Sequence, residues 1–153
     1  METLLVPNEP FLDQVSEMLA DGHLVTIRTK GNSMLPFIRG SRDCVELERC
    51  DRAEVGDIVL ARIPCMGNER HYRYVLHRII GVDGSRVTLM GDGNIKGTEH
   101  CRLEDISGKV VCIIKENGRR KDCRSSASFR RARLWRRLLP LRKYLLCIYR
   151  RIV

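Results

Sequence analysis

Short stretches in which apolar and polar residues alternate fill the middle of this 153-residue chain, and they constrain its fold more than any other feature. Alternation with a period of two is typical of β-strands that bury one face. Glycine, aspartate, asparagine and proline separate the stretches, as they do in turns. The pattern predicts strands over residues 23–29, 44–48, 57–63, 71–82, 85–90 and 108–115.

The clearest turn is Val82-Asp83-Gly84-Ser85, because Asp-Gly between two alternating runs favours a tight β-hairpin. One helix should precede the strands. Asn8 can cap it, Pro10 suits its first turn, and apolar residues recur at helical spacing as far as Leu19, before Gly22 ends it. We therefore expect a mainly β domain, built on a coiled and partly closed sheet, with an N-terminal helix.

Charge divides the chain into two unequal parts. Residues 119–153 hold 13 of the 28 Lys and Arg residues and one acid, so this end is strongly basic while the rest is mildly acidic. We expect residues 1–117 to form one domain, the polar residues 118–128 to be a linker, and residues 129–153 to be a basic amphipathic helical tail. Pro140 predicts a kink or two short helices in this tail. The apolar row of the tail, spaced by three or four positions, is Leu134, Leu138, Leu141, Leu145, Ile148 and Ile152.

Three residues in the β region have the chemistry of an activated serine. Ser33 lies in the turn sequence Gly31-Asn32-Ser33-Met34-Leu35-Pro36, and His77 and Asp92 follow it. A serine hydroxyl needs a neighbouring base to take its proton, and a carboxylate can orient that base. Each residue alone has an ordinary interpretation, as a loop serine, a hydrogen-bonded core histidine and a turn-forming aspartate. Their combination favours a nucleophile, a general base and an orienting acid.

The segments around these residues resemble the type I signal peptidase family, within the clan that includes the self-cleaving SOS repressors. The resemblance covers roughly residues 31–111. Four blocks carry it, in order: 31–36 with Gly40 and Asp43, 55–59, 76–81, and 89–94 with 106–110. It implies the coiled β fold of that clan and serine-type endopeptidase activity.

The third block identifies the branch of the family. Bacterial members have a lysine base before its arginine, whereas this chain has His77 before Arg78, as in the archaeal and endoplasmic-reticulum branch. The resemblance therefore implies Ser33 as nucleophile, His77 as base and Asp92 as orienting acid. Relatives with a histidine base often carry a second acid after the turn, which leaves Glu99 and Asp105 as alternatives to Asp92.

An oxyanion hole and a substrate surface are also required. The backbone N–H of Ser33 is the natural oxyanion donor. Many bacterial relatives add a hydroxyl two positions before the nucleophile, but Gly31 has none, so the side-chain amide of Asn32 is a second candidate. Met34 resembles the family's residue beside the substrate, with core packing as the alternative. Arg78 is expected to be structural and to pair with a carboxylate near the site.

The cysteines do not indicate a metal site. Seven of them occur without a Cys-x-x-Cys pair or a histidine at ligand spacing, which favours reduced thiols over zinc, and neither a metal nor a cofactor is implied. Cys65 and Cys101 are candidates for exposed thiols.

No stretch approaches the roughly 20 apolar residues of a membrane-spanning helix, and residues 1–6 lack the basic region of a signal peptide. We expect a cytoplasmic protein, peripheral at a membrane, unlike the anchored signal peptidases.

The residues and the resemblance together predict a serine endopeptidase that cleaves a peptide or precursor protein through an acyl-enzyme, with the extended peptide paired against a sheet edge. One alternative is a catalytically idle peptide-binding domain of the same fold, tethered by its basic tail. Another is a self-cleaving regulator, disfavoured because roughly 22 residues before the first strand are too few for a helix-turn-helix domain.

The tail allows three partners. It suits an anionic membrane surface or a partner protein, whereas nucleic acid would explain its charge but not its apolar row. All the proposed catalytic residues precede residue 118, so the sequence predicts that cleavage does not require the tail.

Overall fold

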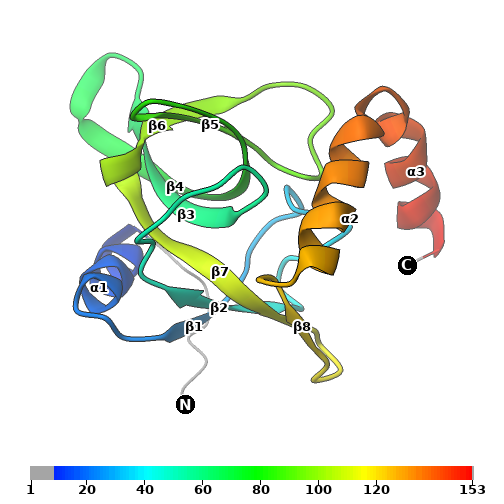
Figure 1. Ribbon diagram of the computed structural model, residues 1–153, viewed down its shortest axis with the longest axis horizontal. Helices are drawn as coiled ribbons and strands as arrows, with labels where there is room; N and C mark the ends of the chain where they lie inside the picture. Colours follow the sequence, from blue (N-terminus) through cyan, green and yellow to red (C-terminus); the bar gives the residue numbers. More distant parts are fainter. Residues whose placement is uncertain (1–8, 153) are drawn as a thin grey trace.

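The computed structural model describes residues 9–152, apart from the side chains of residues 68–70. It is a mainly antiparallel β structure with one N-terminal helix and a helical C-terminal segment (Figure 1), which confirms the predicted fold class. The elements are α1 (Glu9–Ala20), β1 (Val25–Arg28), β2 (Cys44–Glu48), β3 (Ile58–Cys65), β4 (Asn68–Asp83), β5 (Arg86–Met90), β6 (Glu99–Arg102), β7 (Ile106–Ile114), β8 (Arg120–Asp122), α2 (Ser126–Arg137) and α3 (Arg142–Ile152). Two 3₁₀ turns, Leu103–Asp105 and Leu139–Leu141, complete the described chain.

The strands form one sheet in the order β1-β2-β7-β3-β4-β5-β6, with β8 added alongside β7. The sheet is open, because β1 and β6 end this order. The long strand β4 changes neighbours along its length: it pairs with β3 as far as Arg78, and with β5 from Arg78 onward. The predicted hairpin is confirmed, since Asp83 pairs with Arg86 across Gly84 and Ser85.

Two clusters of buried side chains make the core of the domain. The first joins α1 to β1, β2 and β7, and α1 contributes its buried face of Leu12, Val15 and Leu19. The helix ends before Gly22, whose φ of +90° suits the reversal of the chain there. The second cluster lies among β3, β4 and β5 and includes Cys101. The expectation that Cys101 is exposed is therefore wrong, and the Asn8 cap lies outside the described residues.

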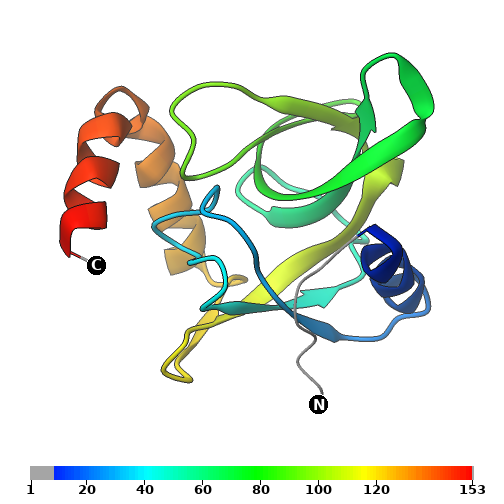
Figure 2. The same ribbon diagram turned by 180° about the vertical axis from the view of Figure 1, so that it is seen from behind.

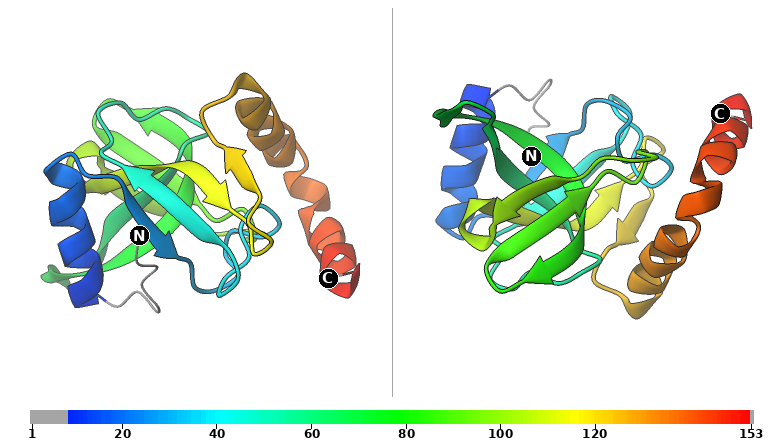
Figure 3. Two further views of the ribbon diagram at one scale, coloured as in Figure 1. Left: turned by 90° about the horizontal axis from the view of Figure 1, so that it is seen from below. Right: turned by 90° about the horizontal axis from the view of Figure 1, so that it is seen from above.

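The C-terminal helices differ in part from the prediction. Residues 118–128 are not a linker, because they include β8, which pairs with β7, and the first turn of α2, capped by Ser125. The kink at Pro140 is confirmed: a 3₁₀ turn separates α2 from α3. The two helices lie at the end of the domain opposite α1 (Figure 3). Within residues 9–152, no helix combines the length and the apolar character needed to cross a bilayer.

Candidate active site

Ser33 lies in the loop between β1 and β2, and hydrogen bonds close the base of this loop. The backbone N–H and the Oγ1 hydroxyl of Thr29 both donate to the carbonyl oxygen of Asp43, at 3.1 and 3.0 Å. The Asp43 carboxylate is fully buried and accepts from Lys115 Nζ at 2.6 Å and from Arg39 N–H at 2.8 Å. The loop is thus fixed at both ends before it reaches the serine.

Glycines allow two turns to pack against each other at Ser33. A side chain at Gly40 would place its Cβ 1.8 Å from the carbonyl oxygen of Gly31, which itself has a φ of +78°. A Cβ at Gly91 would lie 2.4 Å from the Ser33 carbonyl oxygen, and the Gly93 N–H donates to that same oxygen at 2.8 Å. Only glycine permits these approaches, which explains the glycines of the first and fourth sequence blocks.

Ser33, His77 and Glu99 form a continuous chain of hydrogen bonds. His77 Nε2 lies 3.1 Å from Ser33 Oγ, and His77 Nδ1 lies 3.0 Å from Glu99 Oε2. A carboxylate only accepts hydrogen bonds, so Nδ1–H donates to Glu99 and the Nε2 lone pair accepts from the Ser33 hydroxyl. The imidazole is buried, with Glu99 at the start of β6 fixing its orientation from behind. This is the geometry that general-base activation of a serine requires.

Asp92 is not the residue that orients His77, which corrects the prediction. Its carboxylate accepts two hydrogen bonds from the Arg78 guanidinium, at 2.8 and 2.7 Å, and both side chains are buried. Side chains alternate along β4, so Arg78 and its partner face away from the side that carries His77. Arg78 thus has the structural role predicted for it. The third alternative, Asp105, accepts from Arg102 N–H at 2.9 Å and caps a 3₁₀ turn.

The other predicted site residues lie around the serine. Among residues 9–152, no group accepts a hydrogen bond from the Ser33 N–H, so this donor is free for an oxyanion. Asn32 is exposed on the same turn. Met34 packs in the core, as one of its two predicted alternatives had it: it is buried in the first core cluster and accepts from Asp92 N–H through its sulfur at 3.4 Å. It also lines the groove beside Ser33.

Ser33 and His77 are among the residues that line a groove of about 430 Å³. One wall is the end of β1 with the loop that follows it, and the other is the segment 73–77 of β4. Within the described pairings, β1 pairs only with β2, and β4 before Arg78 pairs only with β3. Both walls therefore have a strand edge without a neighbour in the sheet. The apolar lining is Leu12, Ile27, Met34, Ile38, Leu60, Val75 and Leu76.

A comparison of the chain with protein-family models and with curated protein sequences gives no match to either.

Proposed function

We propose that this chain is a serine endopeptidase of the type I signal peptidase kind, which uses Ser33, His77 and Glu99. The observation that carries the proposal is the pair of hydrogen bonds, 3.1 and 3.0 Å long, that joins these three side chains. It is supported by the groove beside them and by the sequence blocks at the two glycine turns.

The reaction follows from the positions of these atoms. Ser33 Oγ attacks the carbonyl carbon of the substrate while its proton moves to His77 Nε2, and Glu99 stabilises the imidazolium that forms. The Ser33 N–H donates to the oxyanion of the tetrahedral intermediate. His77 then gives the proton to the departing amine, which leaves an acyl-enzyme on Ser33. Water, deprotonated by His77, releases the acid and restores the serine.

The groove suits an extended peptide. Unpaired backbone groups on β1 and on the first half of β4 can bond to a peptide between them, in the manner of an added strand. Backbone pairing holds a peptide with little dependence on its side chains, while the apolar lining favours apolar residues next to the cleaved bond. The substrate class is therefore an unfolded segment of a peptide or precursor protein.

A fluorophosphonate probe tests the proposal on the full chain. An activated serine attacks the phosphorus and displaces fluoride, so the chain should gain one phosphonate on Ser33, located by peptide mass spectrometry. A parent protein that stays unlabelled at Ser33 would instead support the idle peptide-binding domain. That alternative has one observation in its favour, because Gly31 lacks the hydroxyl that would supply a second oxyanion donor.

We further propose that the peptidase works at an anionic membrane surface, on which α3 lies. Tyr144, Ile148 and Ile152 are spaced by four residues, so they share one side of α3, and Leu141 of the preceding 3₁₀ turn lies three positions before them. Each of the four is more than half exposed. Exposed Lys143, Arg150 and Arg151 accompany them. An apolar face with basic flanks binds lipid by burial and by attraction to anionic headgroups.

The predicted apolar row does not lie wholly on this face. Leu138 and Leu145 are partly buried against the domain, because the helices meet the body along that side. Vesicles test the proposed membrane contact. The full chain should sediment with vesicles that contain phosphatidylserine and not with vesicles of pure phosphatidylcholine. Binding should weaken as salt shortens the screening length from about 10 Å at 0.1 M to about 3 Å at 1 M.

A further inference from the structure

The side of the C-terminal helices that faces the domain contacts the turn that carries Ser33. Leu35, two residues after the serine, is buried in a small cluster with Trp135 of α2 and Leu146 of α3. The Phe37 ring packs edge-on against the Trp135 ring, with 6.1 Å between centroids. Figure 2 shows the loop between β1 and β2 reaching α2 from the domain. The nucleophile turn therefore has the C-terminal helices as part of its own core.

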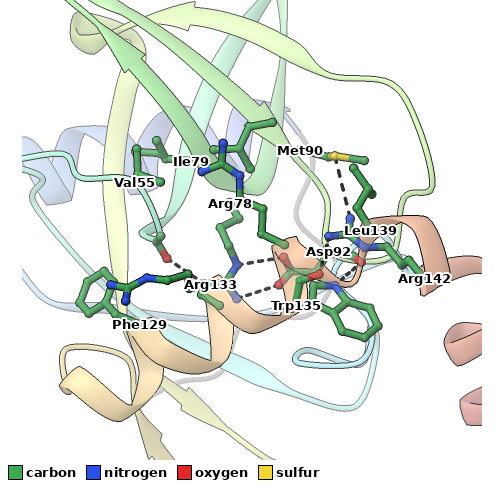
Figure 4. Close-up of a pocket in the computed structure, with 14 residues that line it drawn as sticks. Val55, Arg78, Ile79, Met90, Asp92, Phe129, Arg133, Trp135, Leu139 and Arg142 are labelled. Atoms are coloured by element: carbon green, nitrogen blue, oxygen red, sulfur yellow. Dashed lines mark hydrogen bonds and ion pairs between the residues drawn. The ribbon is translucent and has the colours of Figure 1, made fainter.

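The same helices also hold the second glycine turn, residues 91–94. Trp135 Nε1–H donates to the carbonyl oxygen of Asp92 at 2.8 Å, and Arg142 Nη1–H donates to that of Asn94 at 2.9 Å. The Asp92 side chain is held by Arg78 on the other side (Figure 4). Residues 91–94 also contact the proposed nucleophile, because the Gly93 N–H donates to the Ser33 carbonyl oxygen.

These attachments are concentrated at a few residues. A cavity of about 380 Å³ separates much of α2 from the domain, with Val55, Ile79 and Met90 on one wall and Ala132 and Leu139 on the other. Phe129, near the start of α2 (Figure 4), packs on Gly56 of the domain. The Trp135 contacts lie near the end of the same helix. Within the described residues, the hydrogen bonds from the C-terminal helices to residues 91–94 come from Trp135 and Arg142.

Arg142 is buried between the C-terminal helices and the turn at residues 91–94. It is 4% exposed, and its hydrogen-bond partners in the described part of the chain are two carbonyl oxygens and the Met90 sulfur. Its guanidinium lies 5.2 Å from the centre of the Trp135 ring. Burial lowers the pKa of Arg142, since a cation is costly away from water. The arginine thus binds both the tryptophan and the turn at the expense of its hydration.

We propose that Trp135 and Arg142 are positioning residues for the peptidase reaction: by holding Leu35 and residues 91–94, they fix Ser33 Oγ against His77 Nε2. The inference rests on the proposed function. It reverses the prediction that cleavage does not require the tail. A displacement of about 1 Å at a reacting atom can cost about 100-fold in rate, so loss of these contacts should act on the chemical step.

Trp135→Phe in the full chain tests the proposal, because phenylalanine keeps a ring in the cluster but cannot donate to Asp92. We expect the rate of fluorophosphonate labelling at Ser33 and kcat for a peptide to fall at least 10-fold, with KM changed less than threefold. Arg142→Gln should act in the same direction. The matched control is Arg130→Gln, an exposed arginine of α2 outside these contacts, which should label at the parental rate.

The outcomes separate this inference from the proposed function. If the parent chain is not labelled at Ser33, the proposed peptidase function is contradicted. A parent that labels, together with a folded Trp135→Phe chain that labels within twofold of it, would overturn the positioning role. If Trp135→Phe does not fold, Arg142→Gln decides by the same criterion. Amide exchange gives an independent measurement, since the Gly93 N–H should exchange faster in either variant.

Discussion

Glu99 and His77 come from strands β6 and β4, which are not neighbours in the sheet, yet their side chains meet at 3.0 Å. Strand β5 lies between them, and the sheet coils so that the first residue of β6 faces the middle of β4. The contact between the acid and the imidazole therefore depends on the curvature of the sheet.

The first prediction separates the two acids. Glu99→Gln removes the carboxylate that fixes the His77 tautomer, so kcat should fall by about 10² to 10⁴, while unfolding free energy changes by less than about 1 kcal/mol. Asp92→Asn leaves the buried Arg78 without its anion and should lower the unfolding free energy by roughly 3–5 kcal/mol. Peptide cleavage and urea unfolding of both variants check this. If Glu99→Gln keeps the parental kcat, a group other than Glu99 orients the His77 imidazole.

The second prediction concerns the nucleophile. Ser33→Ala should abolish peptide cleavage and fluorophosphonate labelling, because no other hydroxyl contacts His77 in the described residues. Its unfolding free energy should stay within about 1 kcal/mol of the parent, since a half-buried hydroxyl adds little to the core. Ser85→Ala, at an exposed turn, is the control and should cleave normally. Turnover by purified Ser33→Ala would exclude Ser33 as the nucleophile.

The sequence predicted correctly several features that depend on residues close together in the chain. Alternation located most of the strands, Asp83-Gly84 located the hairpin, and Pro140 located the break between α2 and α3. The contact between Ser33 and His77 is long-range, and it was expected from the resemblance of the sequence blocks rather than from a local pattern.

Which carboxylate contacts His77 depends on residues that are far apart in the sequence. Strand β6 has only four residues, too few for a clear alternation, so the sequence did not show that Glu99 begins a strand. Asp92 lies in an excellent turn sequence, but its partner is set by which face of β4 carries Arg78. Trp135 likewise belonged to an apparently separate tail, and only the folded chain shows that its indole bonds to Asp92. Long-range contacts of this kind leave no periodic signal.

The third prediction concerns pH and the base of the nucleophile loop. Burial raises the pKa of the Asp43 carboxyl, but hydrogen bonds from Lys115 and from the Arg39 and Glu116 backbone hold it below its ordinary value. A carboxyl whose pKa is lowered on folding stabilises the protein above its unfolded pKa, about 3.9, and this contribution is lost as pH falls through the folded value.

The test compares the parent with Asp43→Asn in urea between pH 3 and 7. The variant should be less stable by roughly 3–5 kcal/mol near neutral pH, because it leaves the Lys115 ammonium without its buried partner. This difference should stay constant above about pH 5 and shrink below about pH 4. A difference that grows on acidification would contradict the lowered pKa.

The last prediction concerns the outer face of α3. Leu141→Asp with Ile148→Asp places two carboxylates in this exposed apolar row, one at its start and one within α3, so binding to phosphatidylserine vesicles should fall at least 10-fold. Cleavage of a soluble peptide should remain within twofold of the parent, because neither residue belongs to the cluster around Leu35. The control is Leu24→Asp, a leucine of similar exposure beside α1, at the other end of the domain. It should bind vesicles as the parent does. Equal vesicle binding by the parent and the double variant would exclude this face as the lipid contact. If the face binds a partner protein instead of lipid, the chain should associate with that protein saturably, without lipid and at high salt.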